Sequence, residues 1–206
     1  MFLSVPFVFQ IIILLFSVII HEVSHGLAAL RFGDDTAEKM GRLTLNPLKH
    51  LDPIGSVFLP LMLMIMNSGF IFGWAKPVPY NPLKLKDPRR DTALLAFAGP
   101  LANLSLALIF GLLIRIIGVI PLFASLTPFL MFIVWINLIL AVFNLVPIPP
   151  LDGSKILFYL FPSPELEMTL SRYGIILLLF FIMFAGNIIL PLVMMLFSLF
   201  TGIPLG

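Results

Sequence analysis

Four long apolar stretches constrain this chain more than any other feature of its sequence. Each is close to or longer than the 20 or so residues that a helix needs to cross a bilayer. They run from Pro6 to Leu30, Asp91 to Gly118, Leu122 to Val146 and Tyr173 to Phe200. Sixty per cent of the 206 residues are hydrophobic, too many for a compact soluble monomer to bury. The sequence predicts an all-α integral membrane protein with about four spanning helices and a single domain, residues 1–206.

The last of these stretches contains three residues that disturb helices. Gly186, Asn187 and Pro191 lie within six positions of the chain. Proline removes a backbone hydrogen bond, and kinks cluster at such residues. Two forms of this stretch therefore stay open, one kinked helix and two shorter helical pieces.

A fifth apolar stretch, Ile54 to Phe72, is shorter and is interrupted by Pro60 and by the polar residues at 67–69. If it does not cross the membrane, the three polar loops share one side, which then carries 11 of the 12 Lys and Arg residues. If it crosses, the basic residues divide between the two sides. Because basic loops stay in the cytoplasm, we expect a re-entrant or shallow segment near 54–72, cytoplasmic loops and an outside N-terminus. Arg115 is the exception and should extend toward the outer surface.

The first apolar stretch contains the sequence His21-Glu22-Val23-Ser24-His25. Two histidines four apart lie on one face of a helix, where they can bind one zinc ion while the glutamate between them polarises a water molecule. These three residues are the only ionisable ones from 5 to 29. Each costs about 2–3 kcal/mol or more in hydrocarbon, and a purely structural histidine pair would leave that cost unexplained. The pattern favours a hydrolytic zinc centre within a membrane helix.

A catalytic zinc ion needs a third protein ligand beside the two histidines and one open position. The chain has no cysteine, so this ligand must be His, Asp or Glu. His50 lies in a charged loop and is expected to be solvated at the surface. The same expectation holds for five acidic residues in or next to the first two loops, Asp34, Asp35, Glu38, Asp87 and Asp91.

Asp152 differs from these acids because it lies on a stiff turn. Pro147, Pro149 and Pro150 precede it and Gly153 follows it. Spacing alone leaves two roles open, a metal ligand or the N-cap of a following helix. The predicted topology favours the ligand, because it places Asp152 on the same side as the end of the first helix.

Two asparagines lie in the predicted membrane helices, Asn103 and Asn144. An unpaired amide is costly in an apolar environment, so each should have a hydrogen-bond partner. Two roles stay open for these amides. Each could form an interhelical hydrogen bond, or it could act as a donor that orients the substrate or stabilises the oxyanion.

Three motifs together resemble the ordered signature of the site-2 protease family of intramembrane zinc metalloproteases. They occupy residues 21–25, 98–103 and 144–153. The resemblance covers about residues 7–160, and residues 73–82 are similar to the small bacterial and archaeal branch. The chain shows no segment that resembles the PDZ or nucleotide-binding domains of larger members. Some relatives carry a small β-structured loop at the membrane edge, where this chain has residues 54–72. The resemblance therefore leaves a small β-structured loop open as a second form of this segment.

The resemblance implies hydrolysis of peptide bonds within or next to transmembrane helices of membrane-protein substrates. It implies one zinc ion per chain, held by His21, His25 and Asp152, with Glu22 as the general base. In the family, the asparagines that match Asn103 and Asn144 are associated with the active site. The resemblance also implies an active site toward the cytoplasmic side of the cell membrane, in agreement with the distribution of basic residues.

The expected partners are the lipid bilayer and the transmembrane segments of substrates; the sequence does not indicate an oligomeric state. The net charge is only +2 and the basic residues are scattered, which argues against nucleic acid. Two alternatives to a protease stay open, a membrane zinc transporter or channel and a catalytically inactive membrane-binding homologue. A transport site needs ligands but no positioned base, so Glu22 argues against the first.

The loop from Gly73 to Pro82 contains Pro77, Pro79 and Pro82, which hold a chain extended. A helical substrate must unwind before a protease can attack its backbone. This loop could offer an edge for the addition of the unwound strand. A plain connecting loop is the other interpretation.

Overall fold

The computed structural model describes residues 5–58, 61–62, 65–66, 75–117 and 120–204. Four helices in it are long and apolar enough to cross a membrane. They are α1 (Phe7–Arg31), α4 (Pro88–Ile117), α5 (Thr127–Asn144, extended by the turn before it) and α7 (Pro164–Thr201). The described residues contain no β-strand. The predicted all-α membrane protein with about four spanning helices is confirmed.

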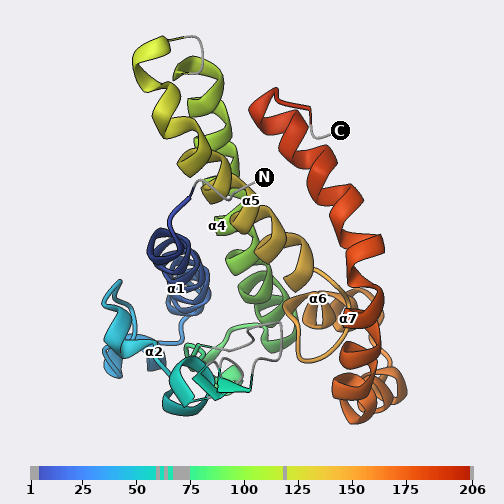
Figure 1. The fold of residues 1–206 in the computed structure, drawn as a ribbon. Coiled ribbons are helices and arrows are strands. Elements are labelled where there is room, and N and C mark those ends of the chain that lie inside the picture. The colour runs from blue at the N-terminus through green and yellow to red at the C-terminus, as the bar shows by residue number, and fades with distance from the viewer. Residues whose placement is uncertain (1–4, 59–60, 63–64, 67–74, 118–119, 205–206) are drawn as a thin grey trace.

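Six short elements connect the long helices. They are α2 (Thr36–Lys39), η1 (Pro47–Lys49), the π-helix η2 (Pro53–Phe58), η3 (Pro82–Lys84), η4 (Pro121–Leu126) and α6 (Asp152–Leu160). All except η4 lie at the lower end of the molecule in Figure 1, where α1 ends and where α4 and α7 begin. The connection between α4 and α5 and the end of α7 lie at the opposite end. The polar loops therefore gather at one end of the four-helix arrangement.

Residues 54–72 are described only in part. The π-helix η2 and short helical turns at 61–62 and 65–66 are present, and Ile54, Phe58 and Ile65 are exposed. The rest of this stretch lies outside the described residues, so its re-entrant or shallow path stays a prediction.

The last apolar stretch forms one continuous helix. Helix α7 has 38 residues and includes Gly186, Asn187 and Pro191. At 1.5 Å per residue it is about 57 Å long, well beyond the roughly 30 Å of a hydrocarbon core. Only five of its residues are buried, so most of its apolar side chains are left to contact lipid.

The ends of α1 and α7 follow from local sequence. Helix α1 stops where Gly33 adopts a φ of 107°, and the Asp34 N–H then donates to the Ala29 carbonyl at 2.9 Å. Helix α7 begins where the Ser163 side chain accepts the N–H of Leu166 at 3.3 Å, and it ends at Gly202, with a φ of 74°.

Arg115 lies near the end of α4 that is opposite the polar loops, as the topology requires. Its Nε donates to the carbonyl of Phe200 at 2.9 Å, and its Nη2 also donates to the carbonyl of Leu199. A cation at the C-terminus of a helix is favourable because the last carbonyls lack partners within the helix. Arg115 therefore ties α4 to the end of α7, and its extension toward the outer membrane surface stays a prediction.

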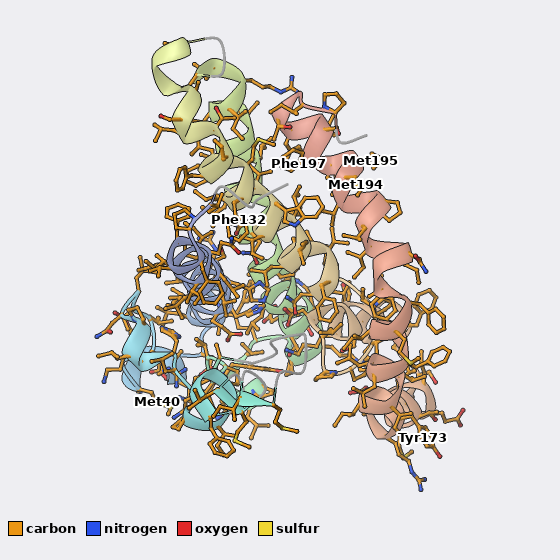
Figure 2. All side chains as sticks on the ribbon, in the orientation of Figure 1. Met40, Phe132, Tyr173, Met194, Met195 and Phe197 are labelled. Atoms are coloured by element: carbon orange, nitrogen blue, oxygen red, sulfur yellow. The ribbon has the colours of Figure 1, made fainter. Side chains whose placement is uncertain are left out.

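The main apolar core lies between α4, α5 and α7. Its central side chain, Phe197, is fully buried, points from α7 toward α5 and meets the ring of Trp135 at 6.0 Å (Figure 2). Small residues let the helices approach, as is common in membrane bundles. A Cβ on Gly111 of α4 would lie 2.8 Å from the Cβ of Phe200 and 3.0 Å from its carbonyl carbon.

Replacing Gly111 with leucine should therefore push α4 and α7 apart. We expect Gly111→Leu to destabilise the purified protein by about 1–3 kcal/mol, the usual cost of overpacking, seen as a lower thermal unfolding midpoint in detergent. Gly186→Leu is the matched control, because an added Cβ at this exposed glycine meets only Leu190, at 3.9 Å. Equal midpoints for the two variants would contradict the close contact of α4 with α7.

Candidate metal centre

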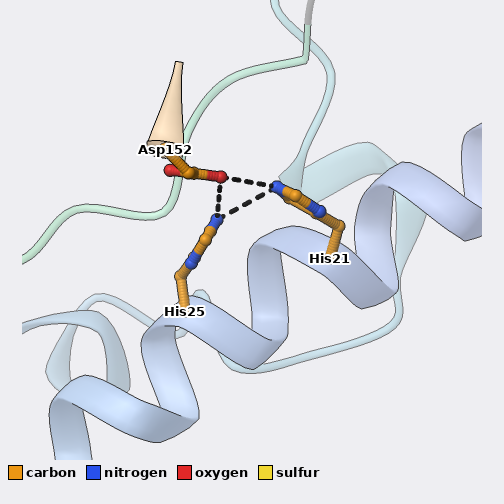
Figure 3. Close-up of side chains that lie close together, drawn as sticks. All are labelled: His21, His25 and Asp152. Atoms are coloured by element: carbon orange, nitrogen blue, oxygen red, sulfur yellow. Dashed lines mark hydrogen bonds and ion pairs between the residues drawn. The ribbon is translucent and has the colours of Figure 1, made fainter. Parts of the chain in front are cut away.

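Three side chains converge between the lower half of α1 and the start of α6 (Figure 3). The Nε2 atoms of His21 and His25 are 3.0 Å apart, and each lies 3.1 Å from Oδ2 of Asp152. All three residues are buried. The fold thus brings Asp152 to two histidines from which it is separated by more than 120 positions in the chain.

The hydrogen bonds of the two imidazoles determine which nitrogens face the centre. Nδ1 of His21 lies 2.6 Å from Oδ1 of Asn103, and Nδ1 of His25 lies 2.7 Å from the carbonyl of Leu95. Since both oxygens only accept, each Nδ1 carries the hydrogen and, in the neutral ring, each Nε2 presents a lone pair. Two lone pairs and a carboxylate oxygen then face one another, an arrangement that requires a cation between them, either a proton or a metal ion.

The donor set and its spacing fit zinc. Zinc takes imidazole nitrogen and carboxylate oxygen at about 2.0–2.1 Å, so neighbouring ligands in a tetrahedron lie about 3.3 Å apart. The observed separations of 3.0 and 3.1 Å are close to this value. Two histidines and one aspartate also leave the open position that a catalytic site requires.

Asp152 is the first residue of α6, and its side chain does not cap that helix. Of the two roles left open by the sequence, the carboxylate is placed for the ligand. Burial alone would raise the pKa of Asp152, but the imidazoles of His21 and His25 and the charge of Lys155 hold that pKa below its usual value. The Lys155 ammonium lies 3.5 Å from Oδ1, the oxygen that faces away from the histidines.

One face of α4 supports both histidines. Leu95, Gly99 and Asn103 are spaced by four residues and so lie on the same side of the helix. Between the two hydrogen-bond acceptors, Gly99 leaves room for the rings, because a Cβ there would lie 2.5 Å from Nε2 of His25 and 2.7 Å from Cε1 of His21.

Asn103 is fully buried, and all its hydrogen-bonding groups are in use. Its oxygen meets His21, and its amide donates to the Ser17 carbonyl at 3.2 Å and to Oδ1 of Asn137 at 2.8 Å. Asn137 in turn donates to the Ser17 hydroxyl at 3.0 Å. Asn137 was absent from the sequence-based candidates, although the same feature, a lone amide in an apolar helix, identifies it.

Asn144, the last residue of α5, is half-buried. Its amide donates to the carbonyl of Leu140 at 2.9 Å, within its own helix. The structure gives it no hydrogen bond to His21, His25 or Asp152, and a role in substrate binding or oxyanion stabilisation stays a prediction.

The expectation of a surface position was wrong for His50, Asp34 and Asp91, which are all buried. The reason is hydrogen bonding to main-chain groups, which compensates for the burial of these polar side chains. Nε2 of His50 donates to the Thr44 carbonyl at 2.7 Å, and Asp91 accepts the N–H of Asp87 at 2.9 Å. Asp34 accepts three bonds, considered further below. None of the three residues belongs to the cluster of potential ligands.

Glu22 is half-buried, and its Oε2 accepts the backbone N–H of Val78 at 2.8 Å. It follows His21 directly, and successive side chains on a helix diverge by about 100°. The carboxylate therefore lies beside the ligand cluster, in contact with residues 75–81.

The contact between Asn103 and His21 predicts a specific effect on metal affinity. Asn103→Leu removes the acceptor that fixes the His21 ring, and we expect zinc affinity to fall about 10- to 100-fold, the usual effect of losing a partner of a metal ligand. Asn144→Leu should leave the affinity within about twofold. Competition with a chromogenic chelator measures both values, and equal affinities would show that Asn103 does not orient the ring.

Comparisons with known proteins identify the family of this chain. The profile of peptidase family M50 matches residues 9–127 and 114–185. The chain is 43% identical over 191 residues to YwhC of Bacillus subtilis, which bears the name of a zinc metalloprotease, covering 88% of this chain and 84% of that one. Rip2 of Mycolicibacterium smegmatis and Rip2 of Mycobacterium tuberculosis, named in the same way, are 35% and 34% identical over 139 residues, which is 68% of this chain.

The chain spans about half, 52%, of the length of the two mycobacterial relatives. No solved structure matches it. The family profile extends over most of the chain and includes both histidines and Asp152. With its four apolar helices and its cluster of zinc-type ligands, the chain belongs to peptidase family M50, the site-2 protease family, and is a membrane zinc metalloprotease.

Proposed function

We propose that this protein cleaves membrane-protein substrates within or next to their transmembrane helices, with one zinc ion per chain held by His21, His25 and Asp152. The observation that carries the proposal is the position of the ligands on a spanning helix. His25 and His21 precede Arg31, the end of α1, by six and ten residues, or about 9 and 15 Å. This depth supports a reaction below the membrane surface.

The residues of the site divide the chemistry between them. Bound zinc supplies a Lewis acid, which lowers the pKa of a water molecule and polarises the scissile carbonyl. Glu22 accepts the proton from the attacking water and delivers it to the leaving amine. Asn103 and the Leu95 carbonyl hold the two imidazoles in the tautomer that ligation needs.

We further propose a multi-pass protein of the cell membrane with its active site toward the cytoplasm. The polar loops that gather at one end of the structure carry nearly all the lysines and arginines, and basic loops remain on the cytoplasmic side (Figure 1). The exposed ring of Tyr173 lies at the same end, as expected for an aromatic residue at a membrane interface (Figure 2).

The partners that we propose are the lipid bilayer and the transmembrane segments of substrates. Addition of a substrate strand to residues 75–81 meets an obstacle in this conformation. The N–H groups of Lys76 and Val78 are already bonded to the His50 carbonyl and to Glu22, and Pro77 and Pro79 have none. We therefore propose a different role for this segment below.

Cleavage of a model transmembrane peptide by the purified, reconstituted protein tests the function. We expect Glu22→Gln to lower turnover by at least about 100-fold, the scale of general base catalysis, while zinc content is retained. Asp152→Asn should lose zinc and cleavage together. Glu38→Gln, a change at an exposed residue of α2, is the control.

Two outcomes would overturn the proposal. If Glu22→Gln cleaves the peptide as fast as the wild type, Glu22 is not the general base. Wild-type protein that cleaves no peptide but moves zinc across vesicles, with Glu22→Gln equally active, would instead identify a transporter.

A further inference from the structure

Residues 75–81 form neither helix nor strand and lie against α1 beside Glu22. The Val78 N–H donates to Oε2 of Glu22, and the Val78 side chain is buried. One helical turn further along α1, a Cβ on Gly26 would lie 2.8 Å from Cγ1 of Val78. The absence of a side chain at Gly26 therefore lets this segment reach the carboxylate.

Arg42 holds the beginning of the segment. It is only 5% exposed, and its Nη2 donates to the carbonyls of Lys76 at 2.8 Å and Pro77 at 3.2 Å. Lys76 is also held by its own N–H, which donates to the carbonyl of the buried His50 at 2.9 Å. Both backbone groups of Lys76 are thus fixed by interior residues.

Asp34 holds the end of the segment. It is fully buried and accepts the N–H of Asn81 at 2.5 Å, together with the N–H and the hydroxyl of Thr36 at 3.0 and 2.5 Å. Burial of a charged group is costly unless its partners compensate. Two buried charges of opposite sign therefore bind the main chain at the two ends of one short segment.

Val78 lies between these two anchor points, with a proline on each side of it. Proline fixes φ and restricts the residue that precedes it, so the segment has few ways to turn its N–H groups elsewhere. Anchoring at residues 76 and 81 then determines where the Val78 N–H points.

We propose that Arg42 and Asp34 are positioning residues for Glu22. They hold residues 76–81 so that the Val78 N–H immobilises Oε2 of the carboxylate and leaves Oε1 to exchange the proton. The inference rests on the proposed role of Glu22 as the base. Small misplacements of a reacting group cost up to about 100-fold in rate, so a base on a fixed main-chain donor is faster than one free to rotate.

Kinetics of peptide cleavage distinguish positioning of the base from support of the metal. Arg42→Met and Asp34→Ala should each lower kcat by about 10- to 100-fold, with KM within about twofold and zinc content unchanged. Arg42→Lys, which can still donate to one carbonyl, should recover part of the loss. Arg31→Met, at an exposed arginine on the same side of the molecule, is the matched control. A loss of zinc in parallel with kcat would overturn the inference.

A backbone substitution tests the donor itself. An ester in place of the amide at residue 78 removes the N–H and keeps the valine side chain. This ester should lower kcat as Arg42→Met does. An ester at Tyr80, whose N–H makes no hydrogen bond within the part of the chain that the structure describes, should not. Equal kcat values for the two esters would overturn the inference.

Amide hydrogen exchange gives a readout that needs neither zinc nor substrate. In the zinc-free protein, the Val78 amide should exchange faster in Arg42→Met and Asp34→Ala than in wild type or Arg31→Met. Unchanged exchange would refute the anchoring. A wild type without peptidase activity would refute the proposed function and leave this exchange result intact, so the two failures are distinguishable.

Discussion

The structure depends on the close approach of two imidazole nitrogens, from His21 and His25, to one carboxylate oxygen of Asp152 among apolar helices. Their ligand atoms lie about 3 Å apart, and the outer nitrogens of both rings are committed to oxygens of α4. Three electron-pair donors at this distance repel one another unless they share a cation. The close approach of α4 at Gly99 and the turn before α6, with Asp152 directed at α1, both serve to bring these atoms together.

The apolar environment makes the supporting hydrogen bonds obligatory. A histidine nitrogen without a partner would cost more within these helices than in water. Asn103 satisfies His21 and is itself satisfied by Ser17 and Asn137. The result is a continuous polar network through α1, α4 and α5, so the packing of three helices and the tautomer of one ligand depend on each other.

The helices and the histidine pair could be predicted from the sequence. The backbone partner of His25 and the burial of two loop residues could not, for physical reasons. Apolar runs predicted the helices because length and hydropathy are local properties, and the spacing of His21 and His25 is fixed by helical geometry. The Leu95 carbonyl is a backbone group without any sequence signature. His50 and Asp34 are ionisable residues in a polar loop, which predicts exposure. Only the folded structure shows that both are buried and hydrogen-bonded to main-chain groups.

Helix α1 presents two adjacent faces to two different environments. His21 and His25 face α4 and α6, whereas Glu22 and Gly26, each rotated by about 100°, face residues 75–81. A metal site needs donors fixed in three dimensions by rigid elements, and the three residues that could hold the ion, His21, His25 and Asp152, all lie in helices. The base that we propose, Glu22, needs one oxygen fixed and one oxygen free, and the single N–H of Val78 provides this. The proposed reaction would therefore take place at the edge where the two faces of α1 meet.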